Sequence, residues 1–299
     1  MPDYDFDWVD AFTDRPFAGN ACMVIQDADT VSVDDRMRLV RETSLSECAY
    51  LVHSALADFG ARYYLAGAEI PMAGHPTVAT VAALARRGRI DLSAGRADIT
   101  LEVGAGVLPV TVTGTAEAPV VQMTQAAPVF GADQDPAEIA AIYGLPAEAV
   151  VGRPQIVSTG TAYCITVLND RAALEAARLD HARLADWRAG SGVAGADIME
   201  PFLVTLGGAT DAGDTYARLL LPPPNPAEDP FTGSATGCMA AYLWRHGLID
   251  RSRFSAEQGH GMGRPGRAEV EVLGPRDDIF GVRVAGAAAF LMAGQVRLG

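Results

Sequence analysis

The side chains best suited to chemistry in this sequence lie at two turns that repeat each other. Residues 69–91 and 228–250 align without a gap, and 10 of the 23 aligned positions are identical. Each copy places a glycine directly before a predicted helix, where backbone N–H groups and the helix dipole favour a bound carboxylate. Tight turns selected only for their geometry would explain one copy. Two copies that each continue with a polar residue favour ligand binding, by Gly74 and His75 in the first turn and by Gly233, Ser234 and Ala235 in the second.

Differences between the two copies indicate where chemistry takes place. Asp229 aligns with Ile70, and His75 aligns with Ser234. Because both turns have the same structural task, a polar residue found in only one copy is a candidate for function. Capping of the following turn is the alternative for Asp229, since aspartate before proline often has that role. We therefore treat His75 and Asp229 as candidate catalytic residues.

A third candidate, Glu47, stands at the opening of the apolar stretch 48–52. A carboxylate between Leu45 and this stretch would lose part of its hydration, which would suit it to general acid/base catalysis. The residues by themselves favour the simpler alternative, a solvated glutamate at the entrance of a strand.

The composition excludes several kinds of catalysis and of partner. All 23 cationic side chains are arginines, so a pyridoxal phosphate Schiff base, a lysine enamine and a P-loop lysine are excluded. The four cysteines and five histidines show no metal-binding spacing, and the cysteines are interpreted as small buried apolar residues. A net charge of −14 without an arginine cluster argues against nucleic acid or a membrane surface as partner. The acidic start, with no apolar run of about 18 residues, predicts a soluble cytoplasmic protein.

The elements that must position these residues also occur twice. Both halves show the order strand, helix, strand, strand, turn, helix and further strands, which predicts an α+β fold of two pseudo-symmetric halves. The helices predicted at 77–87 and 236–246 are apolar nearly all round, so each belongs in a core, wrapped by a sheet. Gly88 and Gly247 mark their ends.

Residues 113–118 interrupt the strand pattern and give the predicted boundary. The first half is then 1–116, completed by strands at 284–299, and the second half is 117–283. Further helices are predicted at 31–41, 135–150 and 171–187, and the tail 279–298 contains two strand-like pieces.

Five motifs resemble, in the same order, those of the phenazine-biosynthesis isomerase (PhzF-like) family. They are Asp10-Ala-Phe-Thr with Pro16-Phe-Ala-Gly-Asn20, Arg41-Glu-Thr-Ser-Leu-Ser-Glu47, Glu69-Ile-Pro-Met-Ala-Gly-His-Pro76, Glu228-Asp-Pro-Phe-Thr-Gly-Ser-Ala235 and Glu257-Gln-Gly-His-Gly-Met-Gly-Arg264. The resemblance implies the fold of diaminopimelate epimerase, with the active site in the cleft between the halves. It also implies that no cofactor is used and that the protein is a homodimer.

For single residues, the resemblance implies that Glu47 is the general acid/base that moves a proton on the substrate. It implies that the two turns hold the carboxylate and the amino or hydroxyl groups of a small substrate, through Gly74, His75, Asp229, Gly233 and Ser234. Cys48, where the family more often has threonine, departs from the pattern, as does the strand before the first turn. These departures leave the substrate open.

Racemases of the same fold need two thiols, one from each half. The corresponding residues here are Ala73 and Thr232, so two-thiol racemisation is disfavoured. The leading hypothesis is a cofactor-independent isomerase that shifts a proton, and with it a double bond, in a small carboxylate-bearing substrate. The alternatives are an epimerase or dehydratase acting on an amino or hydroxy acid, and a non-catalytic small-molecule binding protein with this fold.

Overall fold

The computed structural model describes residues 2–190 and 200–299, and the chain divides into two compact units. Unit 1 extends to Thr124 and includes Ala285–Gly299, and unit 2 is Gln125–Val284. Among the residues described, no helix is long and apolar enough to cross a membrane.

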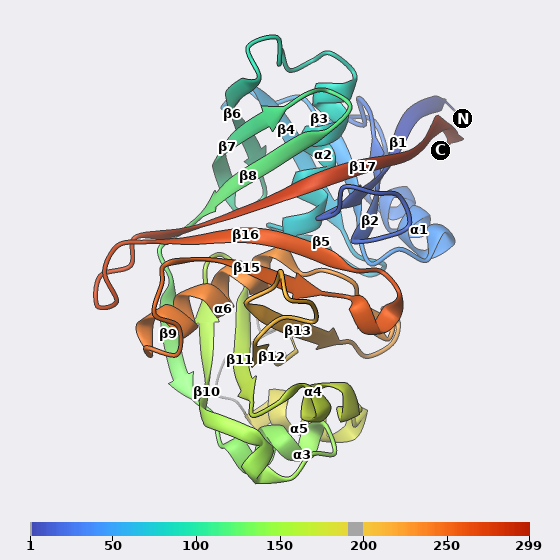
Figure 1. Ribbon diagram of the computed structural model, residues 1–299. Coiled ribbons are helices and arrows are strands. Elements are labelled where there is room, and N and C mark those ends of the chain that lie inside the picture. Colours follow the sequence, from blue (N-terminus) through green and yellow to red (C-terminus); the bar gives the residue numbers. More distant parts are fainter. Residues whose placement is uncertain (1, 191–199) are drawn as a thin grey trace. The chain divides into compact units, whose positions relative to one another are not determined.

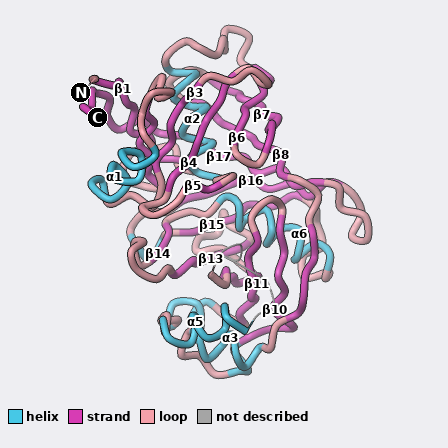
Figure 2. The backbone as a smooth tube through the Cα atoms, turned by 180° about the vertical axis from the view of Figure 1, so that it is seen from behind, coloured by secondary structure: helices cyan, strands magenta, loops and turns pink. Residues whose placement is uncertain are grey.

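Unit 1 is a ring of strands around one helix (Figure 1). Its elements are β1 (Asp3–Ala11), β2 (Asn20–Ile25), α1 (Val33–Thr43), β3 (Cys48–Val52), β4 (Phe59–Tyr64), β5 (Glu69–Ile70), α2 (Gly74–Arg86), β6 (Arg96–Val103), β7 (Gly106–Gly114), β8 (Pro119–Gln125) and most of β17 (Gly281–Arg297). The pairings run β17–β1–β2–β3–β4–β6–β7–β8, and β8 also pairs with β17. The α2 helix packs against β1, β2 and β3. Because Asp3 pairs with Arg297, the two ends of the chain lie side by side (Figure 2).

Unit 2 also surrounds one helix with strands. Its elements are β9 (Val129–Asp133), α3 (Pro136–Ile142), a 3₁₀ turn (Ala147–Ala149), β10 (Val150–Ser158), β11 (Ala162–Leu168), α4 (Arg171–Ala176), α5 (His181–Gly190), β12 (Phe202–Leu206), β13 (Thr215–Leu220), β14 (Glu228–Asp229), α6 (Gly233–Arg245), β15 (Arg253–Gln258), a 3₁₀ turn (His260–Met262) and β16 (Gly266–Leu273). The pairings run β9–β10–β11–β12–β13–β15–β16, and α6 packs against β10, β11, β12 and β16.

The helices α2 and α6 lie in the cores, as their apolar sequences predicted. In α2, residues 74–85 are all buried, and in α6 residues 233–243 are buried. Both helices end at a glycine with φ of 68°, Gly88 and Gly247, a left-handed conformation that glycine adopts without a steric penalty. The helix ends marked in the sequence are therefore confirmed.

One identity between the two copies has a structural cause. The Thr77 hydroxyl donates to Ala73 O at 2.6 Å, and the Thr236 hydroxyl donates to Thr232 O at 2.9 Å. The equivalent threonine of each copy thus donates to the carbonyl four residues earlier, at the start of its helix. This bond gives a buried hydroxyl an acceptor within its own helix, which a buried polar group requires.

Two helices predicted for unit 2 are interrupted. The predicted helix 171–187 is split into α4 and α5, because Asp180 caps a new helix by accepting hydrogen bonds from the backbone of residues 182 and 183. The predicted helix 135–150 ends at residue 142, since Gly144 takes a left-handed conformation with φ of 66° and Pro146 follows. The short helices α3, α4 and α5 enclose a separate apolar cluster that includes Tyr143 and Trp187.

Conversely, the strand structure continues at two places where the sequence predicted a break. Residues 113–118 form the hairpin between β7 and β8, and unit 1 continues through β8 to Thr124. The tail forms one long strand, β17, and not two pieces. It contains a bulge, because Trp8 pairs with Met292 whereas Val9 pairs with Phe290, so that one residue of β17 is extra.

Candidate active site

Glu47 lies in unit 1, in the segment between the end of α1 and the first residue of β3. Its side chain is only 16% exposed, so the simpler alternative of a freely solvated glutamate does not hold. The Oε2 atom of Glu47 lies 3.9 Å from Nδ1 of His75, in the first turn of α2. The structure therefore brings together two of the residues that the sequence indicated, within one unit.

His75 is a neutral imidazole in this environment. Its side chain is 3% exposed, and burial lowers its pKa to about 3, because a charged ring would lose its hydration. The 3.9 Å approach of Glu47 is therefore not an ion pair at neutral pH, although the distance by itself would allow one. The amide of Asn20 lies 3.0 Å from Nδ1 and donates to it, which places the ring proton on Nε2. Among the residues described, Nε2 has no hydrogen-bond partner.

Asn20 was not among the predicted site residues, although it belongs to the motif at residues 16–20. The loop that carries it has an unusual backbone. The N–H of Phe17 donates to Oδ2 of buried Asp10 at 2.8 Å, with Phe17 at φ of 66°. Gly19 also has a positive φ, and a Cβ there would collide with Ala11 O. Gly19, directly before Asn20, could have indicated from the sequence that the backbone is folded tightly next to a functional side chain.

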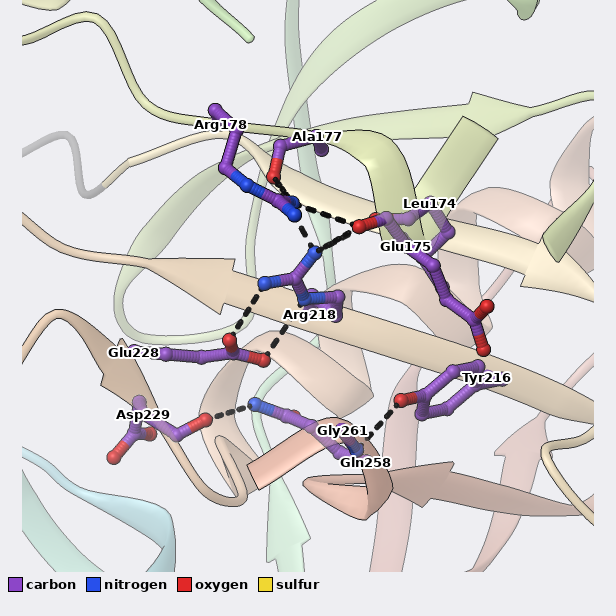
Figure 3. Close-up of polar contacts among 10 residues, drawn as sticks. All are labelled: Leu174, Glu175, Ala177, Arg178, Tyr216, Arg218, Glu228, Asp229, Gln258 and Gly261. Atoms are coloured by element: carbon purple, nitrogen blue, oxygen red, sulfur yellow. Dashed lines mark hydrogen bonds and ion pairs between the residues drawn. The ribbon is translucent and has the colours of Figure 1, made fainter. Parts of the chain in front are cut away.

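Asp229 lies in unit 2, at the end of β14, and its carboxylate is buried. Oδ2 accepts a hydrogen bond of 2.6 Å from the Thr232 hydroxyl. The preceding residue, Glu228, has a different environment: Arg218 donates to its two oxygens at 3.0 and 2.7 Å (Figure 3). Arg218 thus neutralises Glu228. Because successive side chains of a strand point to opposite sides, the carboxylate of Asp229 points away from Arg218 (Figure 3).

The second turn continues into α6 with Ser234, whose Oγ lies 2.8 Å from the hydroxyl of Tyr163. The Gly233 carbonyl accepts from Gln125 Nε2 at 2.9 Å. Both α2 and α6 start without a side-chain cap and without an acidic residue in the first turn. Their first N–H groups and the helix dipoles are thus suited to binding a carboxylate.

The cysteines do not supply a thiolate nucleophile. All four are buried, as the sequence predicted. Burial raises the pKa of the thiols to about 12 in Cys48 and Cys164 and to about 11 in Cys238, and it raises that of Cys22 as well. No group of three or more His, Cys, Asp or Glu side chains within the described part of the chain could hold a metal ion.

Comparison with known proteins places the chain in a family. A family model described as phenazine biosynthesis-like protein (PhzC-PhzF) matches residues 9–294. The uncharacterized isomerase YddE of Salmonella typhimurium is 32% identical over 95% of each chain. The trans-2,3-dihydro-3-hydroxyanthranilate isomerase of Pseudomonas aeruginosa is 28% identical over 97% of this chain and 98% of its own.

The fold agrees with this family. The crystal structure of a PhzF-family phenazine biosynthesis protein from Bacillus anthracis superposes with a TM-score of 0.84 at 24% identity, and covers 100% of both chains. The relatives of this chain are named isomerases. The chain places a neutral His75 beside Glu47 and has two uncapped helix starts. The chain therefore belongs to the phenazine biosynthesis-like (PhzC-PhzF) family and is an enzyme of the isomerase class.

Proposed function

We propose that this enzyme moves a proton, and with it a double bond, within a small unsaturated substrate that carries a carboxylate, without a cofactor. The observation that carries the proposal is the pairing of Glu47 with a neutral His75. A carboxylate that is mostly removed from water can accept a proton from carbon and return it to another carbon. A neutral imidazole can donate a hydrogen bond without itself giving up a proton.

In the proposed reaction, ionised Glu47 removes a proton from a carbon next to the double bond. The electron pair of the broken C–H bond forms a new double bond, the π electrons of the original double bond move to its far carbon, and Glu47 returns the proton to that carbon, where they form the new C–H bond. Atoms and charge balance and the substrate is not oxidised or reduced overall, so no oxidant is needed. The Nε2–H of His75 donates to a substrate oxygen on which negative charge develops.

The residues of unit 2 are assigned to binding in this proposal. The start of α6, with Gly233, Ser234 and Ala235, binds the substrate carboxylate, and Asp229 anchors an amino or hydroxyl group. Gly74 lets the backbone of the first turn approach the substrate. A single substrate contacted by both sets of residues remains the prediction made from the duplicated sequence. A homodimer remains the prediction implied by the family resemblance.

The relative from Pseudomonas aeruginosa supports the substrate class. Its name specifies a dihydro-hydroxyanthranilate, a cyclic amino acid with a carboxylate, a hydroxyl group and ring double bonds. Each of these groups has a matching partner among the residues above. We therefore propose a cyclic or unsaturated amino or hydroxy acid of this kind as the substrate.

The test is proton exchange with solvent. Candidate substrates, starting with trans-2,3-dihydro-3-hydroxyanthranilate, are incubated with the enzyme in deuterated water and followed by NMR. Glu47→Gln should abolish deuterium incorporation while the protein stays folded. Glu42→Gln, on the exposed end of α1, is the matched control and should exchange normally. Exchange that persists in Glu47→Gln would refute the proposed role of Glu47.

The same experiment separates the alternatives. Deuterium at a new carbon identifies the isomerase, whereas deuterium at the original carbon identifies an epimerase. Loss of water with the appearance of a double bond identifies a dehydratase. A ligand that binds without exchanging any proton would support a non-catalytic binding protein.

A further inference from the structure

The motif at residues 257–264 has no role in the reaction proposed above. Gln258, which is 1% exposed, ends β15 and lies against the turn that carries Asp229. Its Nε2 donates to Asp229 O at 2.8 Å (Figure 3) and to Thr232 Oγ1 at 3.2 Å. Its Oε1 accepts from the Thr232 backbone N–H at 3.0 Å. One buried amide thus makes three hydrogen bonds to a single turn.

These bonds determine the direction of the Thr232 hydroxyl. That hydroxyl has one proton to donate. Because Gln258 donates into its oxygen, the proton is directed to Oδ2 of Asp229, at 2.6 Å. Gln258 therefore acts on the Asp229 carboxylate through Thr232, in a buried place where such bonds are strong and cooperative.

The strand registers identify the equivalent positions in unit 1. Tyr63 pairs with Ile70 as Leu219 pairs with Asp229. From this register, the parallel neighbour of residue 60, Glu102, is equivalent to the parallel neighbour of residue 216, Glu257. The next residue in each strand makes Val103 the equivalent of Gln258.

The first copy builds the same turn from apolar residues. Ile70, Ala73 and Val103 occupy the positions of Asp229, Thr232 and Gln258. The chain passes close to both turns: a Cβ at residue 104 would be 2.9 Å from the Cα of Pro71, and one at residue 259 would be 2.5 Å from the carbonyl oxygen of Pro230. The polar set in unit 2 is thus not required to form the turn. All three positions differ together, which indicates that the three polar residues serve one purpose.

We infer that Gln258 and Thr232 are positioning residues that hold the Asp229 carboxylate in the orientation in which it contacts the substrate. This inference rests on the proposed function of Asp229. Holding a polar group in the reactive geometry is a large part of catalysis, and a displacement of about 1 Å can lower the rate about 10²-fold.

The test uses variants of the whole chain of 299 residues. Gln258→Val introduces the residue of unit 1, Thr232→Val removes the hydroxyl at constant shape, and Thr232→Ser keeps the hydroxyl as the matched control. Steady-state turnover of trans-2,3-dihydro-3-hydroxyanthranilate is measured well below the unfolding temperature of each variant. We expect kcat/KM to fall about 10²-fold in the two valine variants, and Thr232→Ser to stay close to the wild type. Unchanged kcat/KM in both valine variants would overturn the inference, as would an equal loss in Thr232→Ser.

Gln258→Glu gives a readout that a purely stabilising residue would not affect. A protonated glutamic acid can donate and accept like the amide, but an ionised one only accepts and would attract the Thr232 hydroxyl away from Asp229. The activity of this variant relative to the wild type should therefore decrease as the pH rises, while both remain folded. A ratio that is constant with pH would contradict the inference.

A substrate-independent measurement separates this inference from the proposed function. The ¹³Cγ resonance of Asp229 is assigned by comparison with Asp229→Asn in carbon-labelled protein. It should shift in Gln258→Val and Thr232→Val but not in Thr232→Ser. If the wild type does not turn over the substrate, the proposed function fails and this resonance still decides the inference. A resonance that stays in place in both valine variants would overturn it.

Discussion

The buried neutral His75 makes the stability of this protein depend on pH in a specific direction. In the unfolded chain a histidine binds a proton below a pKa of about 6.5. In the folded protein burial lowers the pKa of His75 to about 3. Between these values the unfolded state binds more protons than the folded state, so stability falls as the pH falls. The contribution of His75 is fully present above pH 6.5 and is progressively lost towards pH 3.

The size of this effect follows from the same numbers. One pKa unit corresponds to about 1.4 kcal/mol. Lowering the pH from 6.5 to 4 should therefore cost roughly 3 kcal/mol of stability through His75 alone. This is a large share of the 5–15 kcal/mol that is typical of a folded protein.

Urea unfolding of wild type and His75→Gln between pH 4 and 8 measures the effect. The acidic groups common to both proteins cancel in the difference between the two curves. We expect the wild type to lose about 3 kcal/mol more than His75→Gln on going to pH 4. His53→Gln, which removes an exposed histidine, is the matched control. Parallel curves for wild type and His75→Gln would show that His75 is not held neutral by burial.

Three further predictions follow from individual contacts. Asn20→Asp places an acceptor against Nδ1, so the His75 ring should carry its proton there, and kcat/KM should fall about 10²-fold; ring ¹⁵N shifts check the tautomer. Gly237→Ala should destabilise the protein by about 1–3 kcal/mol in urea unfolding, because its Cβ would collide with buried Gln125, whereas Gly190→Ala meets open space. Iodoacetamide at pH 8 should leave the native enzyme active, since burial raises the pKa of every thiol; rapid inactivation would indicate a catalytic cysteine.

Local sequence patterns were sufficient for the elements with the strongest local signals. The core helices α2 and α6 and their glycine ends were predictable, because an apolar surface all round and a left-handed glycine are encoded within a few residues. The breaks near Gly144 and Asp180 were missed, although both residues carry local signals. In those stretches the helical pattern continued, and the capping chemistry outweighed it.

The candidate residues themselves were found from the repeat and the motifs. Comparison of the two copies was enough to select His75 and Asp229. Glu47 was a candidate from its position before an apolar stretch, and the family resemblance favoured it over the alternative of a solvated glutamate. Their partners could not be found in this way. Asn20 is 55 residues from His75 in the chain, and Gln258 is 26 residues from Thr232.

The sequence by itself determined which groups are available for chemistry: carboxylates, one imidazole and two helix starts, with no lysine. Only the tertiary structure decided their chemical state. His75 is neutral because the packing of unit 1 removes it from water, and its proton lies on Nε2 because Asn20 occupies Nδ1. The Thr232 hydroxyl faces Asp229 because Gln258 arrives from another strand. Hydration and hydrogen-bond direction depend on neighbours that are distant in sequence, so no local pattern contains them.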